Sequence, residues 1–161
     1  MAKRNVTTGL IEKYLDRHGW TRHVTMDEPG EVEGIVTSGW RPVGAADGHV
    51  LAIDPMKEKA TLAFAVEELA VAPTDATPVD RLSGLLLAIS AINARLDLGA
   101  FVYDPGNGEL AFRLGLPIDS DDLHYEDFAH CVRAVTTTVD RYVEPLRGII
   151  DGTCSATDVI R

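Results

Sequence analysis

Apolar and polar positions repeat along the first half of the chain with two different periods. Residues 8–18 carry apolar side chains at helical spacing, and Gly19 can end that helix in a left-handed conformation. Strand-like segments follow at 22–27, 31–38, 49–54 and 60–69, with turn sequences at 28–30 and 55–59. Residues 40–48 are typical of a loop that ends in a turn at Asp47 and Gly48. This half therefore predicts one helix followed by antiparallel strands.

The second half has the clearest pattern, in which a long helix, a hairpin and a second long helix follow one another. The first helix is expected at 77–98, with Thr77 as N-cap and Pro78 as its first residue. The hairpin covers 100–116 and turns at 104–108. The second helix covers 123–150, and Pro145 should kink or interrupt it. The expected apolar face of the first helix consists of Val79, Leu82, Leu85, Leu86, Ile89, Ile92 and Leu96.

These elements define an α+β fold with one antiparallel sheet, whose long helices pack on one face. Antiparallel strands need only tight turns, and the helix at 77–98 is the one long crossover. Residues 1–150 are expected to form a single domain, because a chain of 161 residues is long enough for one core. Residues 151–161 are small and polar, which predicts a loose tail.

The helix at 77–98 carries more apolar residues than one buried face requires. A monomer would expose some of them, and contiguous apolar patches commonly mark interfaces. We therefore expect a homodimer that uses this helix or the sheet face opposite the long helices. The alternative is that the first and last helices cover this segment within one chain. The predicted dimer or partner interface consists of Leu85, Leu87, Ala88, Ala91 and Leu98.

Net charge narrows the class of partner. The formal charge of −10 opposes binding to nucleic acid and to anionic membranes, both of which are held mainly by basic side chains. No stretch approaches the roughly 20 apolar residues of a membrane span, and no apolar run follows Lys3 and Arg4. Nothing in the sequence places Cys131 and Cys154 together as a disulfide. A cytoplasmic protein without nucleic-acid or membrane partners is the expectation.

Residue types that often carry chemistry are present, but their spacing does not indicate a site. Five carboxylates near the start of the last helix lack the glycine and spacing of a calcium loop and suit the helix dipole. No two histidines stand at the i, i+4 spacing of a zinc site, and His130 points away from Cys131 on a helix. Gly106 and Gly108 precede a strand, so they suit a turn rather than a phosphate loop. We assign no catalytic residues, no metal and no cofactor. The five carboxylates are Asp119, Asp121, Asp122, Glu126 and Asp127.

Several segments together resemble the YbjN-like bacterial family, whose fold is similar to that of type III secretion chaperones. They are the helix, Gly-Trp and strand opening at 10–20, the run 85–93, the junction 99–104, the strand 108–113 and the helix 126–139 with Asp140 and Pro145 downstream. The resemblance implies a compact α+β domain that is often a homodimer, has no known catalytic residues and is linked to regulation or stress. Secretion chaperones of this fold are acidic dimers that hold an unfolded segment of a partner.

Three functions follow from these expectations. The first is a non-catalytic protein- or peptide-binding domain that acts as chaperone, adaptor or regulator, as a homodimer. The second is an enzyme, which would need a polar pocket that the sequence does not show. The third is an accessory subunit that stabilises a larger assembly.

Overall fold

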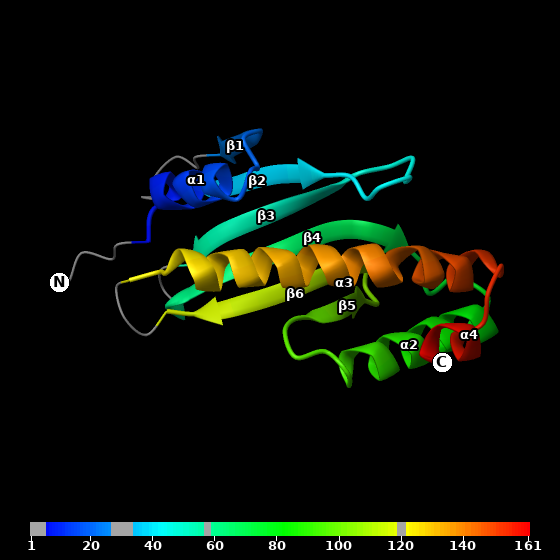
Figure 1. Cartoon of the computed structure of the whole chain (residues 1–161). Coiled ribbons are helices and arrows are strands. Elements are labelled where there is room, and N and C mark those ends of the chain that lie inside the picture. The colour runs from blue at the N-terminus through cyan, green and yellow to red at the C-terminus, as the bar shows by residue number, and fades with distance from the viewer. Residues whose placement is uncertain (1–5, 27–33, 57–58, 119–121) are drawn as a thin grey trace. The chain divides into compact units, whose positions relative to one another are not determined.

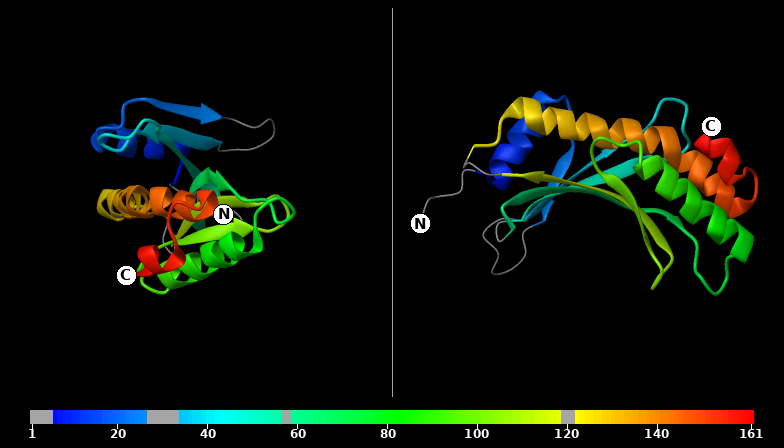
Figure 2. Two further views of the ribbon diagram at one scale, coloured as in Figure 1. Left: turned by 90° about the vertical axis from the view of Figure 1, so that its right-hand side faces the viewer. Right: turned by 90° about the horizontal axis from the view of Figure 1, so that it is seen from below.

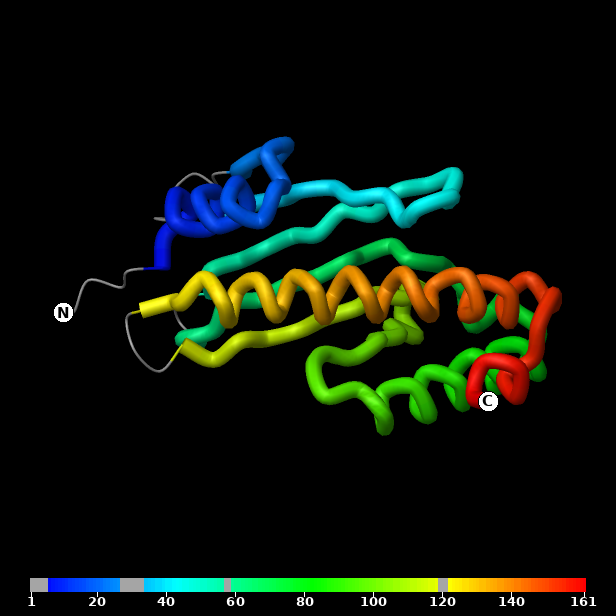
Figure 3. The backbone as a smooth tube through the Cα atoms, viewed as in Figure 1, coloured from blue at the N-terminus to red at the C-terminus, as the bar shows by residue number. Residues whose placement is uncertain are grey.

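The computed structural model describes residues 6–26, 34–56, 59–118 and 122–161. Lys3, Arg4, the predicted turn at 28–30, and the carboxylates Asp119 and Asp121 lie outside these ranges. The helices of the described part are α1 (Thr8–Arg17), α2 (Val79–Asn93), α3 (Tyr125–Asp151) and α4 (Ala156–Ile160). The strands are β1 (His23–Met26), β2 (Ile35–Trp40), β3 (His49–Met56), β4 (Thr61–Val71), β5 (Ala100–Asp104) and β6 (Glu109–Pro117). Figures 1 and 3 show the course of the chain through these elements.

The strands form one antiparallel sheet in the order β1-β2-β3-β4-β6-β5, which confirms the predicted α+β class. Hydrogen bonds from Ile118 N to Ala60 O and from Ala72 N to Gly108 O border the β4–β6 pair. Antiparallel pairing agrees with the tight connections of the hairpins, whereas the long connection from β4 to β5 contains α2. The strands β1 and β5 are the two edges of the sheet.

The chain divides into two compact units, and β4, β6 and α3 each pass from one unit to the other. Unit 1 comprises residues up to Val66 together with 114–133, and unit 2 comprises 67–113 together with 134–161. The sequence predicted a single domain over 1–150, and this stays a prediction.

Unit 1 is held together by apolar side chains between its strands and two helical segments. Ile11 and Leu15 of α1 are fully buried, and Tyr14 lies against Phe128 at the start of α3. Phe128 in turn contacts Phe64, a buried residue of β4. Every second residue of these strands faces this core, as the alternating pattern predicted.

Unit 2 has its own core beneath the second half of α3. Phe101 of β5 packs against Phe112 of β6 and against Tyr142 of α3. The short helix α4 lies beside α2, and both are visible in Figure 2. The turn between β5 and β6 requires Gly108, which has a φ of +75° and lies so close to Pro73 that a Cβ would be 2.6 Å from its backbone. Only glycine avoids both problems.

The structure corrects several details of the predicted helices. α2 is shorter than 77–98, because the extended Pro78, and not Thr77, is its N-cap, and Ala94 is its C-cap. α3 runs through Pro145 without interruption. The predicted loose tail at 151–161 includes α4, whose start is fixed by the reciprocal hydrogen bonds of Ser155 and Asp158.

Candidate functional site

The outer face of α2 is the first candidate for a functional surface. Leu87 is 59% exposed, and two flanking apolar side chains, Leu86 and Val79, are 43% and 79% exposed. The sequence placed Val79 and Leu86 on the same face as Leu85, Ile89 and Ile92, and this was wrong, because the buried residues are centred about 110° or more round the helix from Val79 and Leu86. That buried face consists of Leu85, Ala88, Ile89 and Ile92.

The residues of the predicted interface are therefore divided between the inside and the outside of the protein. Leu85 and Ala88 are buried within unit 2, so they cannot contact another molecule unless the unit opens. Leu87 is exposed, and Ala91 and Leu98 are half-buried. The sequence identified the helix with surplus apolar residues, but its period alone could not decide which of the leucines lie against the unit's own core.

The exposed face of α2 is also unusually free of charge. Asp80 and Arg81, both in the first turn, are the charged residues of this helix. The rest of the outer face is formed by Ser83, Leu86, Leu87, Ser90 and Ala91, which are small or apolar. A solvent-exposed helix normally carries charges on its outer face, so this surface differs from that expectation.

A groove on the sheet face of unit 2 is the second candidate. It has a volume of about 300 Å³ and lies over the hairpin β5–β6 and the adjacent part of β4. Its floor includes Val102 and Ala111, which are directly opposite each other in the β5–β6 ladder. Since Phe101 and Phe112 face α3, strand alternation places this groove on the face that lies away from the helix. Its other lining residues are Glu67, Tyr103, Asp104, Pro105, Asn107, Glu109 and Arg113.

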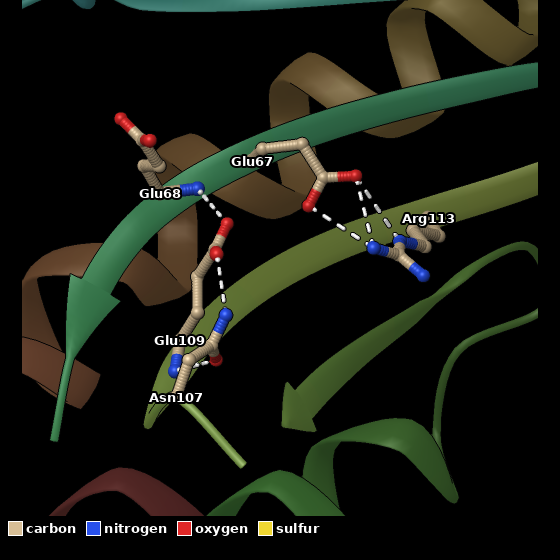
Figure 4. A network of polar contacts seen from close by, with 5 residues as sticks. All are labelled: Glu67, Glu68, Asn107, Glu109 and Arg113. Atoms are coloured by element: carbon tan, nitrogen blue, oxygen red, sulfur yellow. Dashed lines mark hydrogen bonds and ion pairs between the residues drawn. The ribbon is translucent and has the colours of Figure 1, made fainter. Parts of the chain in front are cut away.

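Fixed hydrogen bonds orient the polar side chains of the groove (Figure 4). Both carboxylate oxygens of Glu67 accept hydrogen bonds of 3.2 Å from the Arg113 guanidinium. The Glu109 carboxylate accepts a hydrogen bond of 3.0 Å from Glu68 N and one of 3.2 Å from Asn107 Nδ2. These contacts hold the carboxylates in place without burying them.

The backbone of Glu68 explains why sequence reasoning missed this groove. Regular strand alternation would place the adjacent residues Glu67 and Glu68 on opposite sides of the sheet. In the structure both are exposed, since Glu68 has a φ of +54° and interrupts the alternation, as in a β-bulge. The buried apolar positions are 62, 64, 66 and then 69, so the spacing changes from two to three residues at Glu68. This change in the sequence pattern could have indicated the bulge.

The open edge of β5 is partly covered by Asn93 at the end of α2. The Asn93 side chain donates to Phe101 O and accepts from Phe101 N, both at 2.9 Å. It thus takes the place of a neighbouring strand, and the backbone of Tyr103, two residues further on, faces the same edge. A partner strand could pair with only a short part of β5.

The remaining reactive side chains of the described residues do not form a catalytic arrangement. Burial, with a contribution from Asp127, raises the pKa of the Cys131 thiol to about 11, so it is protonated at neutral pH. The pKa of Cys154 is also raised, by desolvation and by Asp158, and its Sγ donates to Pro145 O at 3.1 Å. No cluster of three or more potential metal ligands exists among the described residues, including Asp122, Glu126 and Asp127. None of the helices in the described residues is long and apolar enough to cross a membrane.

Comparison with known proteins identifies the family. The sequence model of the YbjN family, described as "Putative bacterial sensory transduction regulator", matches residues 7–148. The chain belongs to the YbjN family. A solved structure described as "Crystal structure of YbjN, a putative transcription regulator from E. coli" matches with a TM-score of 0.58 and 18% identity, over 89% of this chain and 92% of that one. None of the curated proteins matches the chain.

The family and the fold agree with the resemblance that the sequence indicated. The family is described as one of regulators, which is consistent with a non-catalytic role for this chain. The crystal structure supports the fold alone, because its sequence identity is low. The likeness to type III secretion chaperones stays an expectation.

Proposed function

We propose that this protein is a non-catalytic cytoplasmic regulator that acts by binding other proteins, and that it forms a homodimer through the outer face of α2. The observation that carries the proposal is the outer face of α2, which carries no charge beyond Asp80 in its first turn and exposes Leu86 and Leu87, in a chain of net charge −10. Two copies of such an acidic protein repel each other, so self-association is favoured where the surface carries little charge.

The area available supports a weak dimer. Complete burial of an exposed Leu or Val contributes about 1.5 to 3 kcal/mol. Scaled by the exposed fractions of Leu87, Leu86 and Val79, one copy contributes roughly 3 kcal/mol. Two copies contribute about twice this, which is comparable with the lower estimates for the cost of association. Micromolar affinity requires a net gain of about 8 kcal/mol, so packing and polar contacts between the two helices must add to this apolar burial.

Antiparallel pairing of two α2 helices across a twofold axis near Leu87 suits both the side chains and the charges. Ser83, Ser90 and Ala91 are small and let the helices approach closely. Arg95 lies just beyond the end of α2, where its guanidinium donates to Ile160 O at 2.7 Å. Asp80 and Arg95 lie at similar distances on either side of Leu87, so Asp80 of one copy would approach this guanidinium of the second. Since both side chains are exposed, this contact would add specificity rather than much affinity.

Sedimentation equilibrium between about 5 and 200 µM tests the proposal. The wild type should show monomer–dimer exchange, and Leu87→Glu should be monomeric because it introduces a charge at the centre of the interface. Val43→Glu is the matched control, since Val43 is fully exposed in a loop of unit 1. A wild type that remains monomeric at the highest concentration would refute the dimer.

The sheet face of unit 1 that lies away from α1 is the second candidate interface. Val24, Met26 and Val50 are exposed by 63%, 52% and 58%. His23 and Thr25 alternate with Val24 and Met26 along β1, and their side chains bond to Asp16 and Glu12 of α1. If Val50→Glu and not Leu87→Glu produces a monomer, this face is the dimer interface.

A further inference from the structure

We infer that the groove of unit 2 binds an arginine or lysine side chain on an exposed segment of a protein partner. This inference names the partner chemistry for the protein binding proposed above and rests on that function. The groove uses a different surface from the outer face of α2, so the two can be tested separately.

The main observation is a pair of like charges placed directly opposite each other. Asp104 and Glu109 are partners in the β5–β6 ladder, and both line the groove. The Glu109 carboxylate reaches towards β4, where it accepts from Glu68 N, and the Asp104 carboxylate turns to Gly106 N, so neither carboxylate is directed at the other. A cation in the groove would be attracted by both carboxylates, whereas an anion would be repelled by both.

The surrounding side chains do not already supply that cation. The Arg113 guanidinium is bound to Glu67. Asp104 Oδ1 accepts from Gly106 N at 2.8 Å, and its second oxygen accepts no hydrogen bond from the described residues. The groove residues thus contribute three carboxylates and one guanidinium, which favours a positively charged ligand.

The floor of the groove selects the shape of the ligand. Val102 is 38% exposed and Ala111 beside it is 3% exposed, so Val102 provides most of the accessible apolar floor. An arginine or lysine has an aliphatic stem that can cover this apolar floor while its charged end reaches the carboxylates. A free inorganic cation would leave Val102 uncovered. The Asn93 side chain already bonds to the N–H and C=O of Phe101. The partner segment would therefore lie across the sheet face rather than pair with β5 as a new strand.

The test is titration of the full chain with acetyl-Val-Arg-Val-amide, followed by backbone amide NMR. Saturable shifts at millimolar peptide should be confined to residues 67, 102–109, 111 and 113. The neutral analogue acetyl-Val-citrulline-Val-amide, which has almost the same shape, should bind at least fivefold more weakly. Equal shifts from both peptides, or none, would overturn the inference, and so would stronger shifts from calcium chloride than from the arginine peptide.

Asp104→Asn is the sharpest variant, because asparagine keeps the oxygen that accepts from Gly106 N and removes only the charge. It should weaken arginine peptide binding at least fivefold. Asp151→Asn makes the same change in net charge at an exposed residue outside the groove and should bind as the wild type does. Unchanged affinity of Asp104→Asn would overturn the inference. Sedimentation keeps the two proposals apart, since Asp104→Asn should still dimerise and Leu87→Glu should still bind the peptide.

Discussion

Replacement of Asn93 by alanine should destabilise the protein more than its partly exposed position indicates. The side chain makes two hydrogen bonds of 2.9 Å to the backbone of Phe101, which is itself only 2% exposed. Asn93→Ala removes both and leaves one N–H and one C=O without a partner at the edge of β5. Each unsatisfied buried group costs about 1 to 3 kcal/mol, and water can reach this edge in part, so we expect a loss of about 2 to 3 kcal/mol.

Urea denaturation followed by circular dichroism measures this loss. With an m-value of about 2 kcal/mol per M, the midpoint should fall by about 1 M or slightly more while the slope stays unchanged. Asn93→Asp keeps the acceptor for Phe101 N but sets a carboxylate oxygen against Phe101 O, so it should lose at least as much. Ser90→Ala, on the exposed face of the same helix, is the control and should change the free energy of unfolding by less than about 0.5 kcal/mol.

A midpoint that falls by less than about 0.3 M in Asn93→Ala would refute the role of Asn93 as a substitute for a neighbouring strand. Hydrogen exchange provides a second observation, since the Phe101 amide should exchange faster in Asn93→Ala than in the wild type. Unchanged protection of that amide would contradict the bond from Phe101 N to Asn93 Oδ1.

Three further predictions concern the turn, a thiol and a histidine. Gly108→Ala should lower the thermal midpoint by about 6 °C or more, because of its φ of +75° and the contact with Pro73, whereas Gly106→Ala meets only the movable Asp104 side chain and should cost less. Cys131, with its raised pKa of about 11 and 2% exposure, should react with iodoacetamide far more slowly than Cys154 at pH 8, and equal rates would contradict its burial. Burial and the nearby Arg133 lower the pKa of His18 below 6.5, so the unfolded state binds more protons and the free energy of unfolding should fall as pH drops from about 6.5. His18→Gln should weaken this dependence, as measured by urea denaturation at pH 7 and pH 5.

The sequence predicted the order of elements because their hydrophobic periods differ clearly. β5 and β6 alternate around a turn rich in glycine, and α3 keeps its apolar spacing through Pro145. The start of α2 was less predictable, since the same local sequence allows Pro78 to be either the extended N-cap or the first helical residue. Local sequence could not show which of Leu85, Leu86 and Leu87 face the core, because this depends on the strands and the helix that pack beside them.

The groove was harder to predict than the fold. Its carboxylates come from β4, β5 and β6, and Asp104 and Glu109 become neighbours only through the register of the hairpin. The left-handed backbone of Glu68 places a second polar residue outward where alternation predicts an inward one. Spacing along the chain indicates pairs within one helix or one strand, and it carries little information about a site assembled across three strands.

The most direct test of the central claim is a distance measurement between two copies of α2. A nitroxide at Ser90→Cys, in a chain that also carries Cys154→Ser, labels one exposed position per copy, since Cys131 is buried and its thiol is protonated. Antiparallel helices about 9 Å apart with a twofold axis near Leu87 place two such labels about 15 to 30 Å from each other. Double electron–electron resonance at about 100 µM should show this distance, and addition of Leu87→Glu should abolish it. A distance above about 40 Å, or no intermolecular coupling, would contradict a dimer formed by α2.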